Sequence, residues 1–248
     1  SYGVSSHAPL PFRTRWTIDD REQTGLYLQE FARLKRLYGD RIELYVGLEI
    51  DYMDEDQQPA NDYFQSLPLD YRIGSVHLLH STQGEIVDID TRPEVFREHV
   101  RLHLGGDLKR VVLAYFDKLM RMIGRGGFDF IGHADKISYN VSCCEPDILG
   151  QQWYKDKISE YFTFIAEKGA MIEVNTKTLH RNGFLYPNKE HFGLIRTLGI
   201  PVVVNSDAHL PELINSGRPE ALRLLKASGI GAVWQLERGV WTEVPIGE

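Results

Sequence analysis

The chain has 248 residues, of which 42% are hydrophobic and 25% are charged. This composition is ordinary for a globular protein and excludes collagen-like, low-complexity and wholly disordered chains. At roughly 150 residues per domain the length allows one or two domains, and a single α/β barrel often has this size. We therefore expect one α/β domain spanning residues 1–248.

The charge balance is acidic, with 28 Lys and Arg against 35 Asp and Glu and a net charge of −7. It disfavours the broad basic surface with which proteins bind nucleic acid, so an anionic ligand needs a local site. Cys143 and Cys144 are adjacent, which suits neither an ordinary disulfide nor a CxxC metal pair. No apolar run is long enough to span a membrane, and the first residues lack the basic stretch of a signal peptide. We expect a cytoplasmic protein with neither nucleic acid nor membrane as a partner.

Short apolar runs alternate with amphipathic stretches along the chain. The predicted strands are 2–6, 42–49, 71–76, 128–131, 171–174, 201–204 and 230–236. The predicted helices are 24–38, 93–104, 108–123, 153–168, 189–198 and 218–228, with a short one near 61–65. This alternation implies a parallel sheet, and the length favours a closed or nearly closed barrel over an open sheet. No glycine-rich phosphate-binding motif follows the first strand, so a dinucleotide or P-loop function is not indicated.

Ionisable side chains gather where the predicted strands end. The carboxyl ends of parallel strands lie on one face of a sheet, so residues at these ends converge in space. Neutral imidazoles bind zinc, iron and manganese, and a carboxylate can bridge two cations. We therefore predict a metal centre that activates water for hydrolysis, with six ligands: His7, Glu49, His77, His133, Asp207 and His209.

Each of these residues also has a structural interpretation, because a single histidine at a strand end is more often a hydrogen-bonded structural residue. Their coincidence at one face favours ligation. Asp207 and His209 are two residues apart in an extended segment and so face the same side. His99 and His103 lie four residues apart on a predicted helix, but the glutamate of an HExxH motif is missing. We interpret that pair as a solvated helix face.

Five segments carry a family resemblance. They are GLEID at 47–51, GSVH at 74–77, GHAD at 132–135, EVNT at 173–176 and NSDAH at 205–209. In this order they resemble the PHP (polymerase and histidinol phosphatase) superfamily, and within it the monofunctional histidinol-phosphate phosphatases, over about residues 3–228. The resemblance implies a distorted (β/α)7 TIM-like barrel that holds two or three divalent ions, namely zinc, manganese or iron. It implies the same six ligands, with Glu49 bridging and with Glu49, Asp207 and His209 as the catalytic residues.

One departure from the family pattern is clear. Members of the family open with a strand that ends in HxH, and this sequence contains no HxH. The resemblance therefore implies that the family's first strand and helix are missing from this chain. An alternative is a PHP-like module whose metal site is degenerate or structural and supports no turnover. A third possibility is an exonuclease-like phosphoesterase, which the acidic charge disfavours.

The expected reaction is metal-dependent hydrolysis of a small phosphomonoester, and the partner is therefore a small phosphorylated substrate. The resemblance points to L-histidinol phosphate, cleaved to L-histidinol and phosphate in histidine biosynthesis. A metal-bridging hydroxide would attack phosphorus in line, with no phosphoenzyme intermediate. Ser206 and Thr176 lie near the strand ends without an evident base, so a serine or threonine nucleophile is not expected.

Arg181 is the predicted phosphate-binding residue, because a guanidinium fork matches phosphate oxygens and the resemblance places an arginine in this loop. Further predicted phosphate contacts are Lys177 and Lys136. Three further cations near the carboxyl ends of the predicted strands are weaker candidates for phosphate binding, namely Arg13, Arg15 and Arg218. Candidates for contact with the organic part of the substrate are Asp51, Tyr52, Phe184, Tyr186, His80 and His180.

Overall fold

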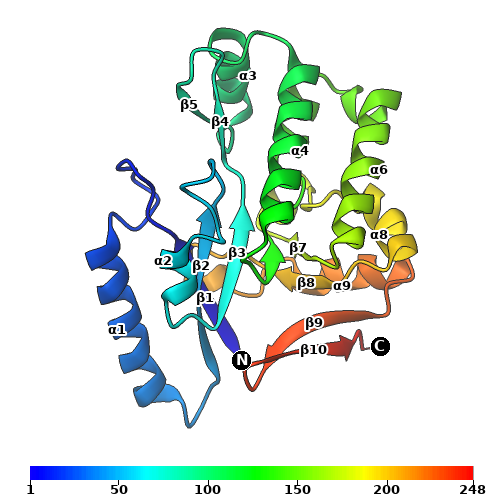
Figure 1. Ribbon diagram of the computed structural model, residues 1–248. Helices are drawn as coiled ribbons and strands as arrows, with labels where there is room; N and C mark the ends of the chain where they lie inside the picture. The colour runs from blue at the N-terminus through cyan, green and yellow to red at the C-terminus, as the bar shows by residue number, and fades with distance from the viewer. Residues whose placement is uncertain (248) are drawn as a thin grey trace.

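A curled parallel sheet forms the centre of the molecule (Figure 1). The structure is a computed structural model that describes residues 1–247, so Glu248 of the predicted domain lies outside the described residues. The strands follow one another in chain order, as in a barrel, and each neighbouring pair is parallel. They are β1 (Tyr2–His7), β2 (Leu44–Asp51), β3 (Tyr71–Ser75), β6 (Phe130–Ile131), β7 (Met171–Asn175) and β8 (Val202–Asn205). The predicted α/β class with a parallel, barrel-like sheet is confirmed.

The helices agree closely with the ranges predicted from hydrophobic periodicity. They are α1 (Arg21–Tyr38), α2 (Asp62–Ser66), α3 (Pro93–Leu102), α4 (Leu108–Arg125), α5 (Ile137–Cys144), α6 (Gln152–Glu167), α7 (Leu179–Asn182), α8 (Phe192–Leu198) and α9 (Arg218–Ala227). Side-chain caps fix several starts: the Asp20 carboxylate accepts the Gln23 N–H at α1, and Asp107 accepts the Arg110 N–H at α4. The pattern did not predict α5, which begins soon after the GHAD segment, or the four-residue helix α7, which lies in the segment predicted as a loop.

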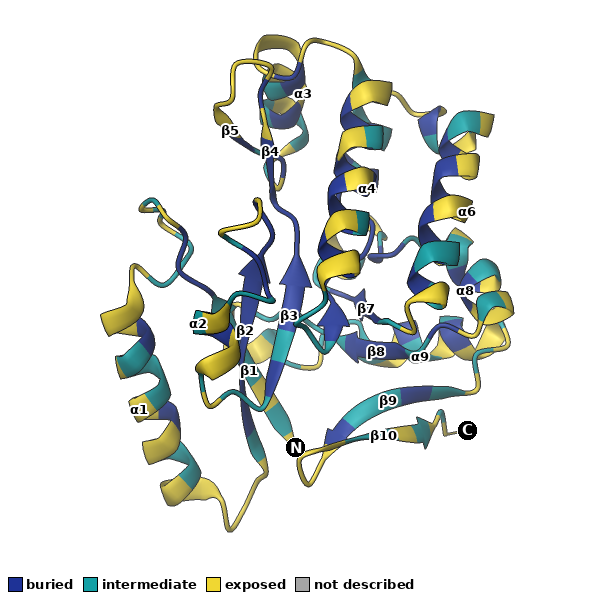
Figure 2. Cartoon of the chain, in the orientation of Figure 1, coloured by how far each residue is buried: buried dark blue, intermediate teal, exposed yellow. Residues whose placement is uncertain are grey.

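The main hydrophobic core lies between the outer face of the sheet and α4, α6 and α8. Phe116 of α4 and Phe162 of α6 are fully buried there, together with Ile172 of β7. Figure 2 shows the same division, with buried strands and helices whose outer sides are exposed. Burying side chains of this size stabilises the fold by about 1.5–3 kcal/mol each. This layer holds the strand ends in fixed positions.

Residues 230–236 do not extend the parallel sheet, although they resemble its other strands in sequence. They lie in β9 (Ala232–Glu237), which pairs with β10 (Val240–Pro245) as an antiparallel hairpin. The turn between these two strands explains their antiparallel pairing. Arg238 and Gly239 have φ of 52° and 75°, and such positive values allow a tight hairpin turn. Leu236 then packs inside the curl of the sheet, against a cluster that includes Tyr71 and Phe130.

A second hairpin, β4 (Leu78–His80) and β5 (Ile86–Asp88), leaves the end of β3. Three short 3₁₀ turns lie at Ile148–Gly150, Lys189–His191 and Pro211–Leu213. Among the described residues, no helix has both the length and the apolar character that crossing a membrane requires. The outer strands of the parallel sheet, β1 and β8, each have one neighbour, and a cavity of about 690 Å³ opens between them.

Phe116→Ala tests the role of the core. Phe116 is 0% exposed, so its loss leaves a cavity, and we expect the free energy of unfolding to fall by about 3–5 kcal/mol. Leu102→Ala is the control, because Leu102 is 53% exposed and its loss should change stability by no more than about 0.5 kcal/mol. Urea denaturation followed by circular dichroism measures both. Equal effects of the two substitutions would contradict this assignment of the core.

Candidate metal centre

Glu49 lies at the centre of a cluster of imidazoles at the carboxyl ends of the strands. Its Oε1 is 2.8 Å from His133 Nε2 and 3.4 Å from His77 Nε2, and its Oε2 is 3.7 Å from His7 Nε2. The parallel register pairs His7 of β1 with Glu49 of β2, which brings these two side chains to one level. The other two histidines follow β3 and β6 by two residues. The predicted convergence of these four residues is therefore present.

The arrangement of donor atoms fits a divalent cation. His77 Nε2 and His133 Nε2 lie 3.0 Å apart, so two ring nitrogens face each other beside one carboxylate. The opposite nitrogen of His77, Nδ1, lies 2.9 Å from Asp51 Oδ1, the kind of outer partner that orients a metal-binding histidine. Ligand atoms of His7, Glu49 and His77 all lie within 4.8 Å of one another. Nitrogen donors with one carboxylate suit zinc, manganese or iron.

The charges in this cluster shift one another's pKa values. Burial opposes ionisation of Glu49, but the nearby His7, His133 and His77 hold its pKa well below the usual range. Burial likewise opposes protonation of His77, yet Asp51 and Glu49 raise its pKa to about 10. A cation that binds the His77 ring must therefore displace a proton, so metal binding and proton release are linked.

Backbone strain marks the same positions. His133 and Asp207 have φ of 29° and 46°, in the left-handed region that side chains other than glycine rarely adopt. Residues held there cost about 1–3 kcal/mol each and cluster at functional sites. Gly132, the residue before His133, must lack a side chain, because a Cβ at this position would lie 2.6 Å from Ser75 Oγ. That hydroxyl donates a 2.8 Å hydrogen bond to Glu49 Oε1.

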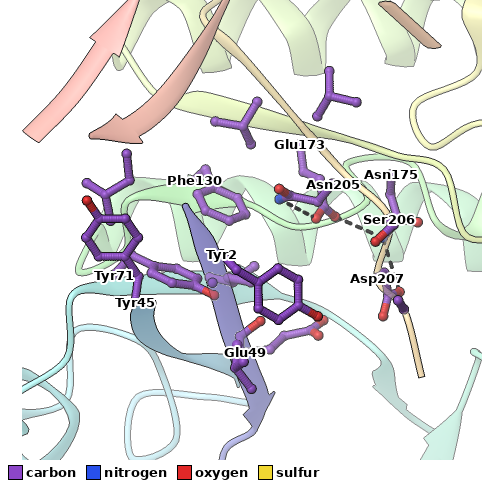
Figure 3. Close-up of a pocket in the computed structure, with 18 of the residues that line it drawn as sticks. Tyr2, Tyr45, Glu49, Tyr71, Phe130, Glu173, Asn175, Asn205, Ser206 and Asp207 are labelled. Atoms are coloured by element: carbon purple, nitrogen blue, oxygen red, sulfur yellow. Dashed lines mark hydrogen bonds between the residues drawn. The ribbon is translucent and has the colours of Figure 1, made fainter. Parts of the chain in front are cut away.

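Asp207 and His209 form a second group on the same cavity. Figure 3 shows Asp207 there, near Asn175 and Ser206. The Asp207 carboxylate lies 3.2 Å from Lys177 Nζ and accepts a 3.1 Å hydrogen bond from Asn175 Nδ2. His209 is 60% exposed in its side chain, and its Nε2 is 3.4 Å from Lys177 Nζ. The structure thus brings together four of the six predicted ligands, and the remaining two line the cavity beside Lys177.

Glu173 is a buried acid that sequence reasoning did not select as a site residue. It accepts hydrogen bonds from the His133 backbone N–H at 2.8 Å, from Asn175 Nδ2 at 3.0 Å and from Asn205 Nδ2 at 2.9 Å. Burial raises its pKa. It ties the turn that carries His133 to β7 and β8. The available signal was a glutamate in the middle of the apolar strand Met171–Asn175.

The predicted phosphate-binding cations have different surroundings. Lys136 is buried, and its Nζ lies 3.1 Å from Asp90 Oδ1 and 4.9 Å from the centre of the Tyr186 ring. Its charge is thus balanced by Asp90. Arg181 is exposed on the short helix α7. Arg218, a weaker candidate for phosphate binding in the sequence analysis, is half-buried and lines the same cavity as Glu49.

The chain is similar to several known proteins. The model of the PHP domain family matches residues 1–177. A protein of Schizosaccharomyces pombe named a probable histidinol-phosphatase is 26% identical over 219 residues, which cover 86% of this chain and 69% of the relative. A protein of the same name from Deinococcus radiodurans is 25% identical, covering 91% of this chain and 80% of its own length.

Two solved structures share the fold. The first, from Listeria monocytogenes and assigned as a histidinol phosphatase, HisK, has a TM-score of 0.78 at 21% identity and covers 88% of this chain and 87% of its own. The second, HisK of Lactococcus lactis in complex with zinc, L-histidinol and phosphate, has a TM-score of 0.62 at 16% identity and covers 88% and 79%. Their likeness supports the distorted barrel as the architecture of the parallel sheet.

Asp51→Asn should weaken metal binding. The amide cannot stabilise the His77 ring as the carboxylate does, so we expect zinc affinity to fall by about 10–100-fold. Equilibrium dialysis with metal analysis measures the change. Asp54→Asn is the control, because Asp54 is exposed and its carboxylate caps its own loop. Unchanged zinc affinity in Asp51→Asn would contradict the role given to this contact.

Metal affinity should depend on pH. Because the pKa of His77 is raised to about 10, the ring carries a proton throughout the neutral range, and a bound cation displaces it. We expect the zinc association constant to rise by about tenfold per pH unit between pH 6 and 8. Competition against a chelator of known protonation constants measures this slope. A slope near zero would contradict the release of a proton from His77 on metal binding.

Proposed function

Because the chain belongs to the PHP domain family, we propose that it is a metal-dependent phosphoric monoester hydrolase acting on L-histidinol phosphate. The observation that carries the proposal is the cluster of three imidazoles around the buried Glu49 carboxylate. The names of the curated relatives support the same activity. The bound molecules in the Lactococcus lactis structure, zinc, L-histidinol and phosphate, support this choice of substrate.

The residues of the two groups have distinct roles in this proposal. His7, Glu49, His77 and His133 would hold one part of a centre of two or three divalent ions, and Asp207 and His209 the other. When bound, such cations lower the pKa of water and offset the negative charge of the phosphoryl group. Asp51 keeps the His77 ring oriented, and Ser75 keeps Glu49 in place.

Cations and aromatic side chains on the cavity wall would bind the substrate. Arg218 lines the cavity and would attract phosphate oxygens, and Lys177, which lies beside Asp207, and Arg181, which is exposed on α7, are the further cations of this proposal. The Trp16 ring lies 4.9 Å from the His7 ring, centre to centre, and lines the cavity. A flat aromatic surface beside the metal-binding residues suits an imidazole-bearing substrate.

We further propose that residues 1–248 form a single PHP-type metal-dependent phosphoesterase domain. The family model ends at residue 177, but the chain beyond it shares the main core. Phe192 of α8 and Leu225 of α9 are 0% exposed within the same cluster as Phe116. Because the segment after residue 177 packs into this core, its removal from the fold would expose buried apolar side chains.

Phosphate release from L-histidinol phosphate, measured with zinc, manganese or iron(II), tests the proposal. We expect release by the wild-type protein and loss of both metal and release in Glu49→Gln, with Glu30→Gln as an exposed control. Metal retained without release from any phosphomonoester would support the structural-site alternative. Cleavage of DNA ends in preference to small esters would support the exonuclease-like one.

Arginine substitutions test how the phosphate group is held. Arg181→Ala and Arg218→Ala should each retain metal and raise the KM for the phosphate ester by about tenfold, equivalent to about 1.4 kcal/mol. Arg223→Ala is the control, since Arg223 is exposed and paired with Glu220 on the same helix as Arg218. Steady-state kinetics give KM and kcat for each variant. A residue whose loss leaves both constants unchanged does not bind phosphate.

A further inference from the structure

A second cavity, of about 490 Å³, lies beside α4, at the β4–β5 hairpin and the segment that follows β2. In Figure 1 α4 stands next to this hairpin, on the outer side of the sheet. None of the residues that line it also lines the cavity of the metal centre. The proposed phosphatase function makes no use of it.

Three cations from one side of α4 face this cavity. They are Arg110, Lys118 and Arg121. At 100° per residue, these positions fall within about 80° of one another around the helix. In the part of the chain that the structure describes, none of the three forms an ion pair, although other cations of α4 and α6 do.

Two acids also line the cavity, Asp54 and Glu55. Glu55 forms an ion pair with Arg125, which does not line it. The Asp54 Oδ1 accepts the backbone N–H groups of Asp56 and Gln57 at 2.9 and 3.0 Å, which leaves the charge of this carboxylate in place. The three cations of α4 thus outnumber the two acids on the cavity wall.

The burial of Lys118 is the clearest sign that a positive charge at this cavity lacks a partner. It is only 4% exposed, and its ammonium has one hydrogen bond, 2.8 Å long, to the backbone oxygen of Leu78. An ammonium has three donors, and burying it with a single hydrogen bond is costly. Burial and the nearby Arg121 guanidinium lower the pKa of Lys118 to about 8, although the charges of Asp51 and Asp54 act in the opposite direction. An anion beside it would remove this cost.

We propose that this cavity binds a small phosphate ester, with Lys118 and Arg121, three residues apart on α4, at the phosphate and Arg110, about 12 Å from Lys118 along the helix, on the same wall. A guanidinium fork beside an ammonium matches the shape and the double charge of a phosphate monoester better than those of a single carboxylate. The apolar body of the ligand would lie against Leu79 and Leu104. The site is distinct from the metal centre, because the residues that line it differ from those that line the first cavity.

Pyridoxal 5′-phosphate is a suitable probe, because it carries both a phosphate and an aldehyde. The neutral amine of Lys118 adds to the aldehyde and loses water to form an imine, and borohydride reduces the imine to a stable secondary amine. Peptide mapping by mass spectrometry then measures labelling at each lysine. We expect Lys118 to be labelled at least fivefold more by pyridoxal 5′-phosphate than by pyridoxal, and sulfate to protect it.

The variant Arg110→Gln/Arg121→Gln separates phosphate binding from the reactivity of the amine. It keeps Lys118 but removes the guanidinium forks, so labelling of Lys118 should fall at least fivefold. Lys109→Gln is the matched control, because Lys109 lies on α4 outside the cavity, over the Trp153 ring, and labelling should be retained. Equal labelling by pyridoxal, unchanged labelling in the double variant, or no preference for Lys118 over exposed lysines would each overturn the proposal.

Discussion

The buried carboxylate of Glu49 is the constraint on which the candidate site depends. A carboxylate that is 8% exposed at the end of an apolar strand is stable only with partners that carry or share positive charge. The structure supplies them from neighbouring strand ends, as imidazoles on both carboxylate oxygens and a hydroxyl from Ser75. Gly132 gives that hydroxyl its space. The same partners that satisfy the carboxylate form the donor set of a metal centre.

The outer layers make this arrangement possible. Two strained residues, His133 and Asp207, hold φ angles that cost free energy, and the fold must provide the compensation. Large buried side chains between the sheet and the helices α4 and α6 provide it. Glu173 transmits this rigidity to the site, because it fixes the His133 backbone to the strands β7 and β8. Stability and the geometry of the centre are therefore linked through the middle of β7.

The two cavities differ in the charged side chains that dominate their walls. The first is built around acids that gather cations, with Glu49, Glu173 and Asp207 on its wall. The second has unpaired cations of α4 on its wall and would gather an anion. The separation follows from the fold, since one opens between β1 and β8 and the other lies beside α4. The proposed phosphorylated substrate and the proposed phosphorylated ligand would thus use different side chains.

The sequence by itself determined the alternation of the main strands and helices and the convergence of His7, Glu49, His77 and His133. Local periodicity marks the elements, and parallel strands bring their carboxyl ends to one face whatever the loops between them do. Tertiary structure alone decided which of the similar apolar runs leave the sheet, as β9 does. It also decided which charges find partners: Lys136 is paired with Asp90, whereas Lys118 is left with a carbonyl. Such pairings join residues about 40 positions apart, so no local pattern contains them.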